Sequence, residues 1–71
     1  MTAGQAIEVV INGERRTVHR GTLLDLLAQL DLDPRTVVVE HNRRIVRRPA
    51  LGGVTVAPGD SLELVHFVGG G

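Results

Sequence analysis

A short leucine-rich segment is the strongest constraint on how this chain folds. Thr22 precedes it as an N-cap, and Asp25 completes a capping box in which Asp replaces the usual Glu or Gln. Asp31, Asp33 and Pro34 end the segment. The leucines fall at helical spacing and form one broad apolar stripe: Leu23, Leu24, Leu26, Leu27 and Leu30. In a chain of 71 residues this single helix needs another apolar layer to cover it, and the remaining sequence has to supply a sheet.

The segment before the helix has the pattern of a β-hairpin. Ile7, Val9 and Ile11 alternate with other residues and lie on one face of a strand. Asn12-Gly13 follows, and this pair is a strong hairpin signal because both central positions of a type I′ turn need positive φ. Residues 14–19 are therefore predicted to return as a second, antiparallel strand.

The second half of the chain reads as extended segments separated by turns. Pro49 lacks a backbone donor and precedes two glycines at positions 52 and 53, which favours a loop there. The predicted elements are a strand at 37–40, a turn at His41-Asn42, a continuation at 43–46, a loop at 47–53, a short extended or 3₁₀ piece at 54–56, a turn at 58–60 and a last strand from Ser61 or Leu62.

These elements predict one α+β domain over residues 1–68, followed by a flexible glycine tail at 69–71. The order is β-β-α-β-β-(short element)-β, with one main helix on one face of a mixed sheet of about four to five strands. The first and last strands are the most apolar, so we place them side by side at the centre of the sheet. That pairing is parallel, because the intervening elements form a crossover.

The face of the sheet away from the helix is predicted to carry an apolar patch. Alternation along the last strand separates two sets of residues: Leu62, Leu64 and His66 on one face, and Glu63, Val65 and Phe67 on the other. No second helix is predicted to cover Val65 and Phe67, and Val38 and Val10 should point to the same side. Contiguous apolar patches on small proteins often mark partner sites. Incidental exposure is the alternative.

The sequence ends in Gly69-Gly70-Gly71, directly after the apolar run at residues 62–68. Glycine has no Cβ, so such a tail fits a channel too narrow for other residues. Fully extended, three residues reach roughly 10 Å beyond the strand. The tail therefore suits an enzyme that acts on the Gly71 carboxylate, with a frayed end as the alternative.

Composition argues against several classes of function. The formal net charge is zero and Phe67 is the one aromatic residue, which weakens a nucleic-acid interpretation. We find no run of transmembrane length and no signal-peptide pattern, so we expect a cytoplasmic protein without membrane contact. Cysteine and lysine are absent from the sequence, and all eight basic residues are arginine. We therefore expect no disulfide and no side-chain thiol or lysine amine able to capture an activated carboxylate.

No side-chain constellation predicts catalysis or metal binding. The three histidines are spread over different elements, without the spacing of a zinc motif. We therefore expect no catalytic residue and no bound metal or cofactor. A basic cluster at Arg43, Arg44, Arg47 and Arg48 is either a solvated loop or an electrostatic contact with an acidic partner.

The whole chain resembles the ThiS-type sulfur carriers of thiamine biosynthesis, which have a ubiquitin-like β-grasp fold. The resemblance rests on the order and spacing of five segments: Val-Ile-Asn-Gly-Glu at 10–14, the leucine helix at 22–30, Val-Val-Val-Glu-x-Asn-x-x-Ile-Val at 37–46, Pro-Gly-Asp-Ser-Leu-Glu-Leu at 58–64, and the ending Phe-Val-Gly-Gly-Gly. One departure is that Arg48 precedes Pro49 where relatives often carry Val-Pro-Arg, which leaves the docking role of this loop open.

The resemblance implies a mechanism centred on Gly71. An E1-like enzyme uses ATP to adenylate this glycine while Gly69 and Gly70 enter the partner's active site. Sulfur from a cysteine desulfurase then displaces AMP, and the resulting thiocarboxylate serves thiazole synthase. The chain itself is then a monomeric carrier rather than an enzyme, with Val38, Val65 and Phe67 as its partner-binding surface.

Related functions are also compatible with the sequence. The small subunit of molybdopterin synthase shares the fold, the glycine ending and the chemistry. Sulfur carriers of other pathways, ubiquitin-like protein modifiers and a β-grasp module that only binds are further alternatives.

Overall fold

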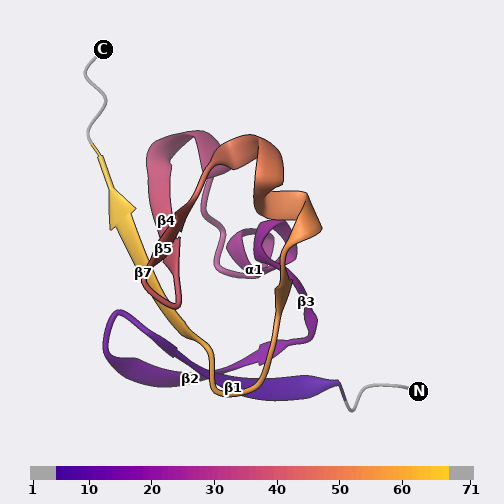
Figure 1. Ribbon diagram of the computed structural model, residues 1–71. Coiled ribbons are helices and arrows are strands. Elements are labelled where there is room, and N and C mark those ends of the chain that lie inside the picture. Colours follow the sequence, from indigo (N-terminus) through magenta and orange to yellow (C-terminus); the bar gives the residue numbers. More distant parts are fainter. Residues whose placement is uncertain (1–4, 68–71) are drawn as a thin grey trace.

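A computed structural model describes residues 5–67 of the chain (Figure 1). The predictions for the tail, Gly69, Gly70 and Gly71, lie outside the described residues. The elements in chain order are β1 (Ala6–Ile11), β2 (Glu14–His19), β3 (Gly21–Thr22), α1 (Leu23–Gln29), η1 (Pro34–Thr36), β4 (Val37–His41), β5 (Arg44–Val46), η2 (Arg48–Gly53), β6 (Thr55–Val56) and β7 (Ser61–His66), where η marks a 3₁₀ helix. Between residues 5 and 67, no helix has the length and apolar character to cross a membrane.

The main sheet has five strands in the order β2-β1-β7-β4-β5. β1 and β7 are parallel neighbours, with Val10 opposite Ser61 and Ile11 opposite Leu62, so the predicted central pairing is confirmed. β4 pairs antiparallel with both β7 and β5. Figure 1 shows α1 on one side of β4, β5 and β7, with the β1–β2 hairpin crossing the end of these strands. This is the predicted mixed sheet of a β-grasp fold with one main helix.

The two strongest local signals in the sequence are confirmed. Asn12 and Gly13 have φ of 52° and 85°, as a type I′ turn requires. The Thr22 hydroxyl accepts a hydrogen bond from the Asp25 N–H (3.1 Å), and the Asp25 carboxylate accepts one from the Thr22 N–H (2.9 Å). These two bonds form the capping box and satisfy donors that the first helical turn leaves free.

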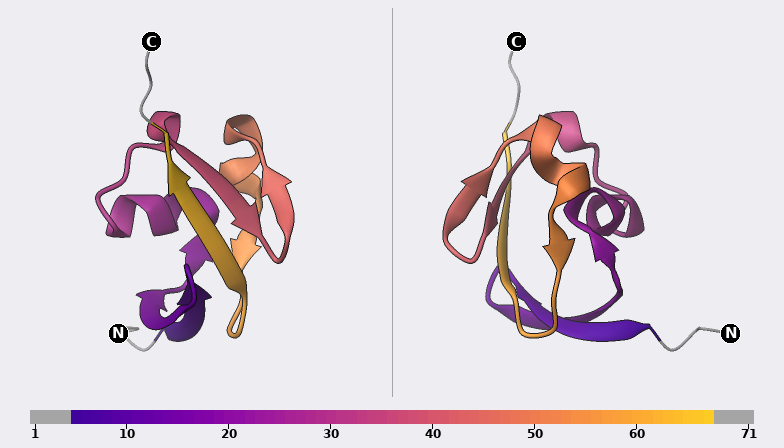
Figure 2. Two further views of the ribbon diagram at one scale, coloured as in Figure 1. Left: turned by 90° about the vertical axis from the view of Figure 1, so that its left-hand side faces the viewer. Right: turned by 45° about the vertical axis from the view of Figure 1, so that its right-hand side comes forward.

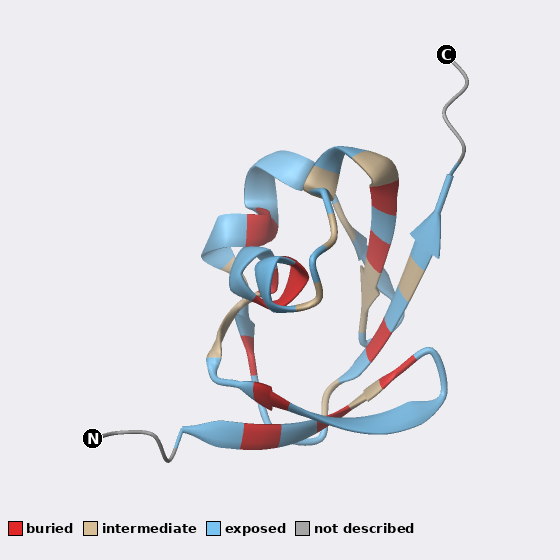
Figure 3. Ribbon diagram, turned by 180° about the vertical axis from the view of Figure 1, so that it is seen from behind, coloured by how far each residue is buried: buried red, intermediate tan, exposed pale blue. Residues whose placement is uncertain are grey.

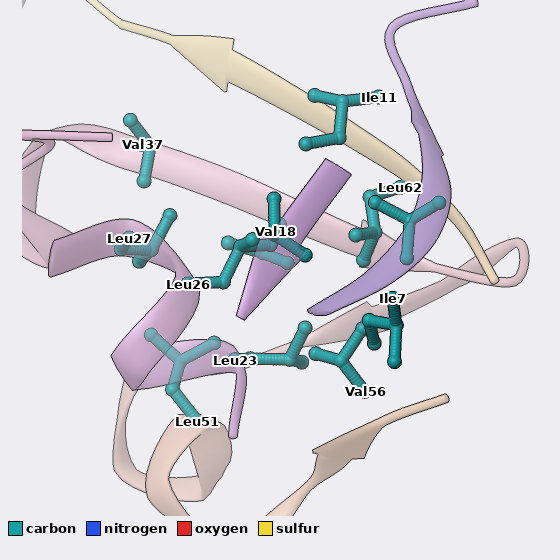
Figure 4. Close-up of a cluster of buried hydrophobic side chains, with 12 residues drawn as sticks. Ile7, Ile11, Val18, Leu23, Leu26, Leu27, Val37, Leu51, Val56 and Leu62 are labelled. Carbon is teal, nitrogen blue, oxygen red and sulfur yellow. The ribbon is translucent and has the colours of Figure 1, made fainter. Parts of the chain in front are cut away.

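Side chains from both layers form a single core. Figure 4 shows this cluster between α1 and the sheet. Its buried members come from β1, β2, α1, β4, η2, β6 and β7: Ile7, Val9, Ile11, Val18, Leu23, Leu26, Leu27, Val37, Val39, Leu51, Val56 and Leu62. The predicted leucine stripe was wrong at Leu24, which is 42% exposed. The buried leucines of α1 span roughly 100° of the helix surface, and Leu24 lies roughly 60° beyond that arc.

The predicted loop at 47–53 was also wrong, because most of it is the 3₁₀ helix η2. Pro49 lies in the first turn of η2, where a missing N–H costs no hydrogen bond. Leu51 is 1% exposed and belongs to the core. The predicted piece at 54–56 contains β6, which pairs antiparallel with β3 in a second, two-stranded sheet.

Two asparagine side chains connect neighbouring strands at the ends of β1 and β4. The Asn12 amide accepts a hydrogen bond from the Leu64 N–H (2.8 Å) and donates one to the Leu64 carbonyl (3.2 Å). It therefore extends the β1–β7 pairing by mimicking a peptide group. Asn42 accepts a hydrogen bond from the Ser61 N–H (2.8 Å). The predicted turn at His41-Asn42 lies one residue later, because His41 ends β4 while Asn42 and Arg43 have positive φ.

Candidate docking surface

The face of the sheet away from α1 carries the predicted apolar residues. The β4–β7 register places Val38 directly opposite Val65. Phe67 follows β7 and donates its N–H to the Thr36 carbonyl (3.1 Å), which holds it beside the start of β4. Val38, Val65 and Phe67 are 40%, 55% and 48% exposed. Val10, predicted for the same side, is half-buried. The exposure of the patch is thus confirmed, while its role in partner binding stays a prediction.

Ile45 extends this patch and was not predicted. It lies on β5 opposite Glu40, on the same sheet face as Val38, and is 64% exposed. The sequence interpretation missed Ile45 because the register of the β4–β5 hairpin was not known. That register depends on placing the turn at Asn42 and Arg43. We define the outer patch as Val38, Ile45, Val65 and Phe67. The left-hand view of Figure 2 shows its strands together, with β7 in front and β4 and β5 beside it.

A shallow pocket of about 200 Å³ lies at one edge of the outer patch. Apolar residues and two arginines line it: Val37, Val38, Ile45, Val46, Arg47 and Arg48. The predicted arginine cluster is therefore divided: Arg43 lies in the turn and Arg44 begins β5, whereas Arg47 and Arg48 line the pocket. Arg47 and Arg48 thus lie at the edge of the outer patch, while the contact of the cluster with an acidic partner stays a prediction.

The outer patch adjoins the point where β7 ends. Figure 3 shows the C-terminal part of β7 as exposed. Beside it, η1 begins after Asp33, whose carboxylate accepts hydrogen bonds from the Arg35 N–H and guanidinium and lies 2.9 Å from that guanidinium. These contacts lower the pKa of Asp33 to about 2. The outer patch therefore reaches the last described residue of the chain, Phe67.

A polar cluster connects the β4–β5 turn to the turn before β7. The Asp60 carboxylate accepts hydrogen bonds from the Ala57 N–H (2.8 Å) and the Asn42 amide (3.2 Å), and lies 2.7 Å from Nε2 of His41. Burial raises the pKa of Asp60, but the hydrogen bonds outweigh it and hold the pKa below its usual 3.8. The cluster links the end of β4 to the start of β7, at the opposite end of these strands from Val65 and Phe67. Within residues 5–67, no three His, Cys, Asp or Glu side chains gather as a metal site.

We expect Asp60→Asn to lower the free energy of unfolding by about 1–2 kcal/mol at pH 7, because charge-assisted hydrogen bonds are lost. The pKa of Asp60 is lower in the folded than in the unfolded chain. Its carboxylate therefore stabilises the fold above the unfolded pKa of about 3.9, and this contribution disappears as the pH falls through the folded pKa. Urea unfolding at a series of pH values should show the difference closing in acid. Asp31→Asn, at an exposed carboxylate, is the control, and a difference that is constant with pH would contradict the expectation.

Comparison with known proteins finds similarity to one family and to proteins named for thiamine biosynthesis. The family model described as "ThiS family" matches residues 9–71. The sulfur carrier protein ThiS of Bacillus subtilis is 43% identical over 51 residues, which are 72% of this chain and 77% of that protein. The crystal structure of the thiamine biosynthesis protein ThiS from Geobacter metallireducens aligns with a TM-score of 0.79 at 32% identity, and covers 92% of this chain and all of that one.

Two longer relatives contain a segment similar to this chain. Proteins named thiazole synthase from Magnetococcus marinus and Paramagnetospirillum magneticum are 39% and 42% identical over 66 residues. The match spans 92% of this chain but only 20% of either relative. The family match covers most of the chain, and the B. subtilis carrier and the G. metallireducens structure agree with it. The chain therefore belongs to the ThiS family.

Proposed function

We propose that this chain is a sulfur carrier of thiamine biosynthesis and that its Gly71 carboxylate is the atom group that carries sulfur. The observation that supports this most is that the family match runs through residue 71, so it includes the glycine ending. The outer patch supports the proposal because it lies directly before that ending. In this proposal residues 1–68 form the docking body and residues 69–71 the reactive tail.

The proposed chemistry begins with activation. A carboxylate is a poor electrophile, so an E1-like partner transfers AMP from ATP to the Gly71 carboxylate and releases pyrophosphate. A persulfide sulfur, supplied by a cysteine desulfurase, attacks the acyl carbon and AMP leaves. A thiol then reduces the resulting acyl disulfide, and the thiocarboxylate remains on Gly71. The carrier contributes the terminus and the docking surface, while its partners supply catalysis.

Thiazole synthase is the proposed recipient of the sulfur. Two relatives that bear this name contain a segment similar to this chain within one longer polypeptide. When two binding partners are joined in one polypeptide, each has a higher effective concentration near the other, which favours their association. We assign the role of docking surface for that enzyme to the outer patch.

The test is intact-mass analysis after incubation with the E1-like enzyme, ATP and a cysteine desulfurase with cysteine. We expect the mass increment for replacement of oxygen by sulfur, located on the C-terminal peptide. The reaction without ATP is the control and should leave the mass unchanged. Higher-mass covalent conjugates with protein lysines, in place of the increment, would contradict the proposal and indicate a protein modifier.

A further inference from the structure

We propose that Glu40 and Glu63 together bind a cationic side chain of thiazole synthase when that enzyme covers the outer patch. This inference rests on the proposed function and adds the charge that the partner must present. It also assigns a role to two like-charged side chains that lie opposite each other on adjacent strands, an arrangement that destabilises a sheet.

The β4–β7 register brings the two carboxylates together. Glu40 and Glu63 are directly opposite each other on adjacent antiparallel strands. Their neighbours Val39 and Leu62 are buried in the core, so both glutamates point to the outer face. The Cβ atoms of directly opposed residues lie roughly 5 Å apart, and like charges in such a pair destabilise the sheet.

Neither carboxylate has a cationic partner within the described part of the chain. The ion pairs among residues 5–67 are Asp33 with Arg35 and His41 with Asp60. Arg15 lies on the same sheet face, opposite Val10, but β2 and β7 are separated by β1. Among residues 5–67, no ion pair offsets the repulsion between the two glutamates.

The pair borders the outer patch. Glu40 is paired on its other side with Ile45, and Glu63 lies two residues before Val65 on the same face of β7. A partner that covers these apolar side chains also removes water from the carboxylates. Burying two unpaired carboxylates is costly, whereas a guanidinium or ammonium placed between them relieves both the desolvation and the mutual repulsion.

The partner surface that fits this face therefore has apolar side chains opposite the outer patch and an arginine or lysine opposite the glutamate pair. We assign this surface to thiazole synthase, because relatives named for that enzyme contain the carrier-like segment in the same polypeptide. The E1-like enzyme is the competing occupant, and the experiment below separates the two.

The test measures binding of thiazole synthase to the 71-residue chain by isothermal titration calorimetry at low and high salt. We expect the double variant Glu40→Gln, Glu63→Gln to bind roughly tenfold more weakly, with a shallower salt dependence than the unaltered chain. Its melting temperature should stay equal or rise by roughly 2–4 °C, because the repulsion is removed. Glu8→Gln is the matched control and should bind normally. Glu8 is an exposed residue of β1 that lies on the same face of the sheet as the glutamate pair, but outside the outer patch.

Three results would overturn the inference. These are an affinity within twofold of the unaltered chain, a lowered melting temperature that reveals a structural role, and a selective loss of adenylation by the E1-like enzyme. Mass analysis of sulfur loading in the same samples separates this inference from the proposed function. If the unaltered chain never acquires sulfur the proposed function fails, whereas normal loading with unchanged binding refutes only the role of the glutamate pair.

Discussion

Deletion of Gly71 is expected to abolish sulfur loading while the domain stays folded. The proposed acceptor of AMP is the carboxylate of this residue, and the deletion moves the carboxylate back along the chain by roughly 3.5 Å. Misplacement of a reacting group by this distance removes the near-attack geometry on which such catalysis depends. Intact-mass analysis with the E1-like enzyme, ATP and the sulfur source should detect no increment.

Two controls make this result specific. A chain extended by one alanine after Gly71 should also fail to load, since it displaces the carboxylate in the opposite direction. Both variants should keep the melting temperature of the unaltered chain, because the core lies between residues 7 and 62. A truncated chain that still acquires sulfur would refute Gly71 as the site, and a truncated chain that unfolds would show that the tail has a structural role.

The features that the sequence predicted best are those in which local chemistry and tertiary packing agree. Asn12-Gly13 supplies the two positive φ values of its turn, and Thr22 with Asp25 supplies the capping box. The parallel pairing of β1 and β7 was predictable because both strands are apolar and are joined by a crossover through the helix.

The errors occur where tertiary contacts decide the structure. η2 contains Pro49 and two glycines, which favour a loop, but burial of Leu51 against the core holds a 3₁₀ helix. The pairing of β3 with β6 involves two residues on each strand, which are too few to show any periodicity. In the outer patch, Val65 and Phe67 followed from alternation along one strand. Ile45 required the register of the β4–β5 hairpin, and the glutamate pair required the register between β4 and β7.

Leu23→Ala is expected to remove more than half of the free energy of unfolding of the domain. Leu23 is 0% exposed and begins the apolar stripe of α1. Truncation of a buried leucine to alanine costs roughly 3 kcal/mol, because apolar contacts are lost and a cavity remains. A domain of this size buries only about 60% of its unfolded surface and has a total stability of roughly 5 kcal/mol. Urea unfolding followed by far-UV circular dichroism measures the loss.

The neighbouring leucine provides the matched control. Leu24→Ala makes the same chemical change on the same helix, but at a position that is 42% exposed. Its cost should stay below about 1 kcal/mol, since less apolar area returns to water and alanine has the higher helix propensity. Equal losses at the two positions would contradict the assignment of Leu23 to the core and of Leu24 to the surface. A large loss at Leu23 with normal sulfur loading at low temperature would show that α1 supports the docking surface without contacting the partner.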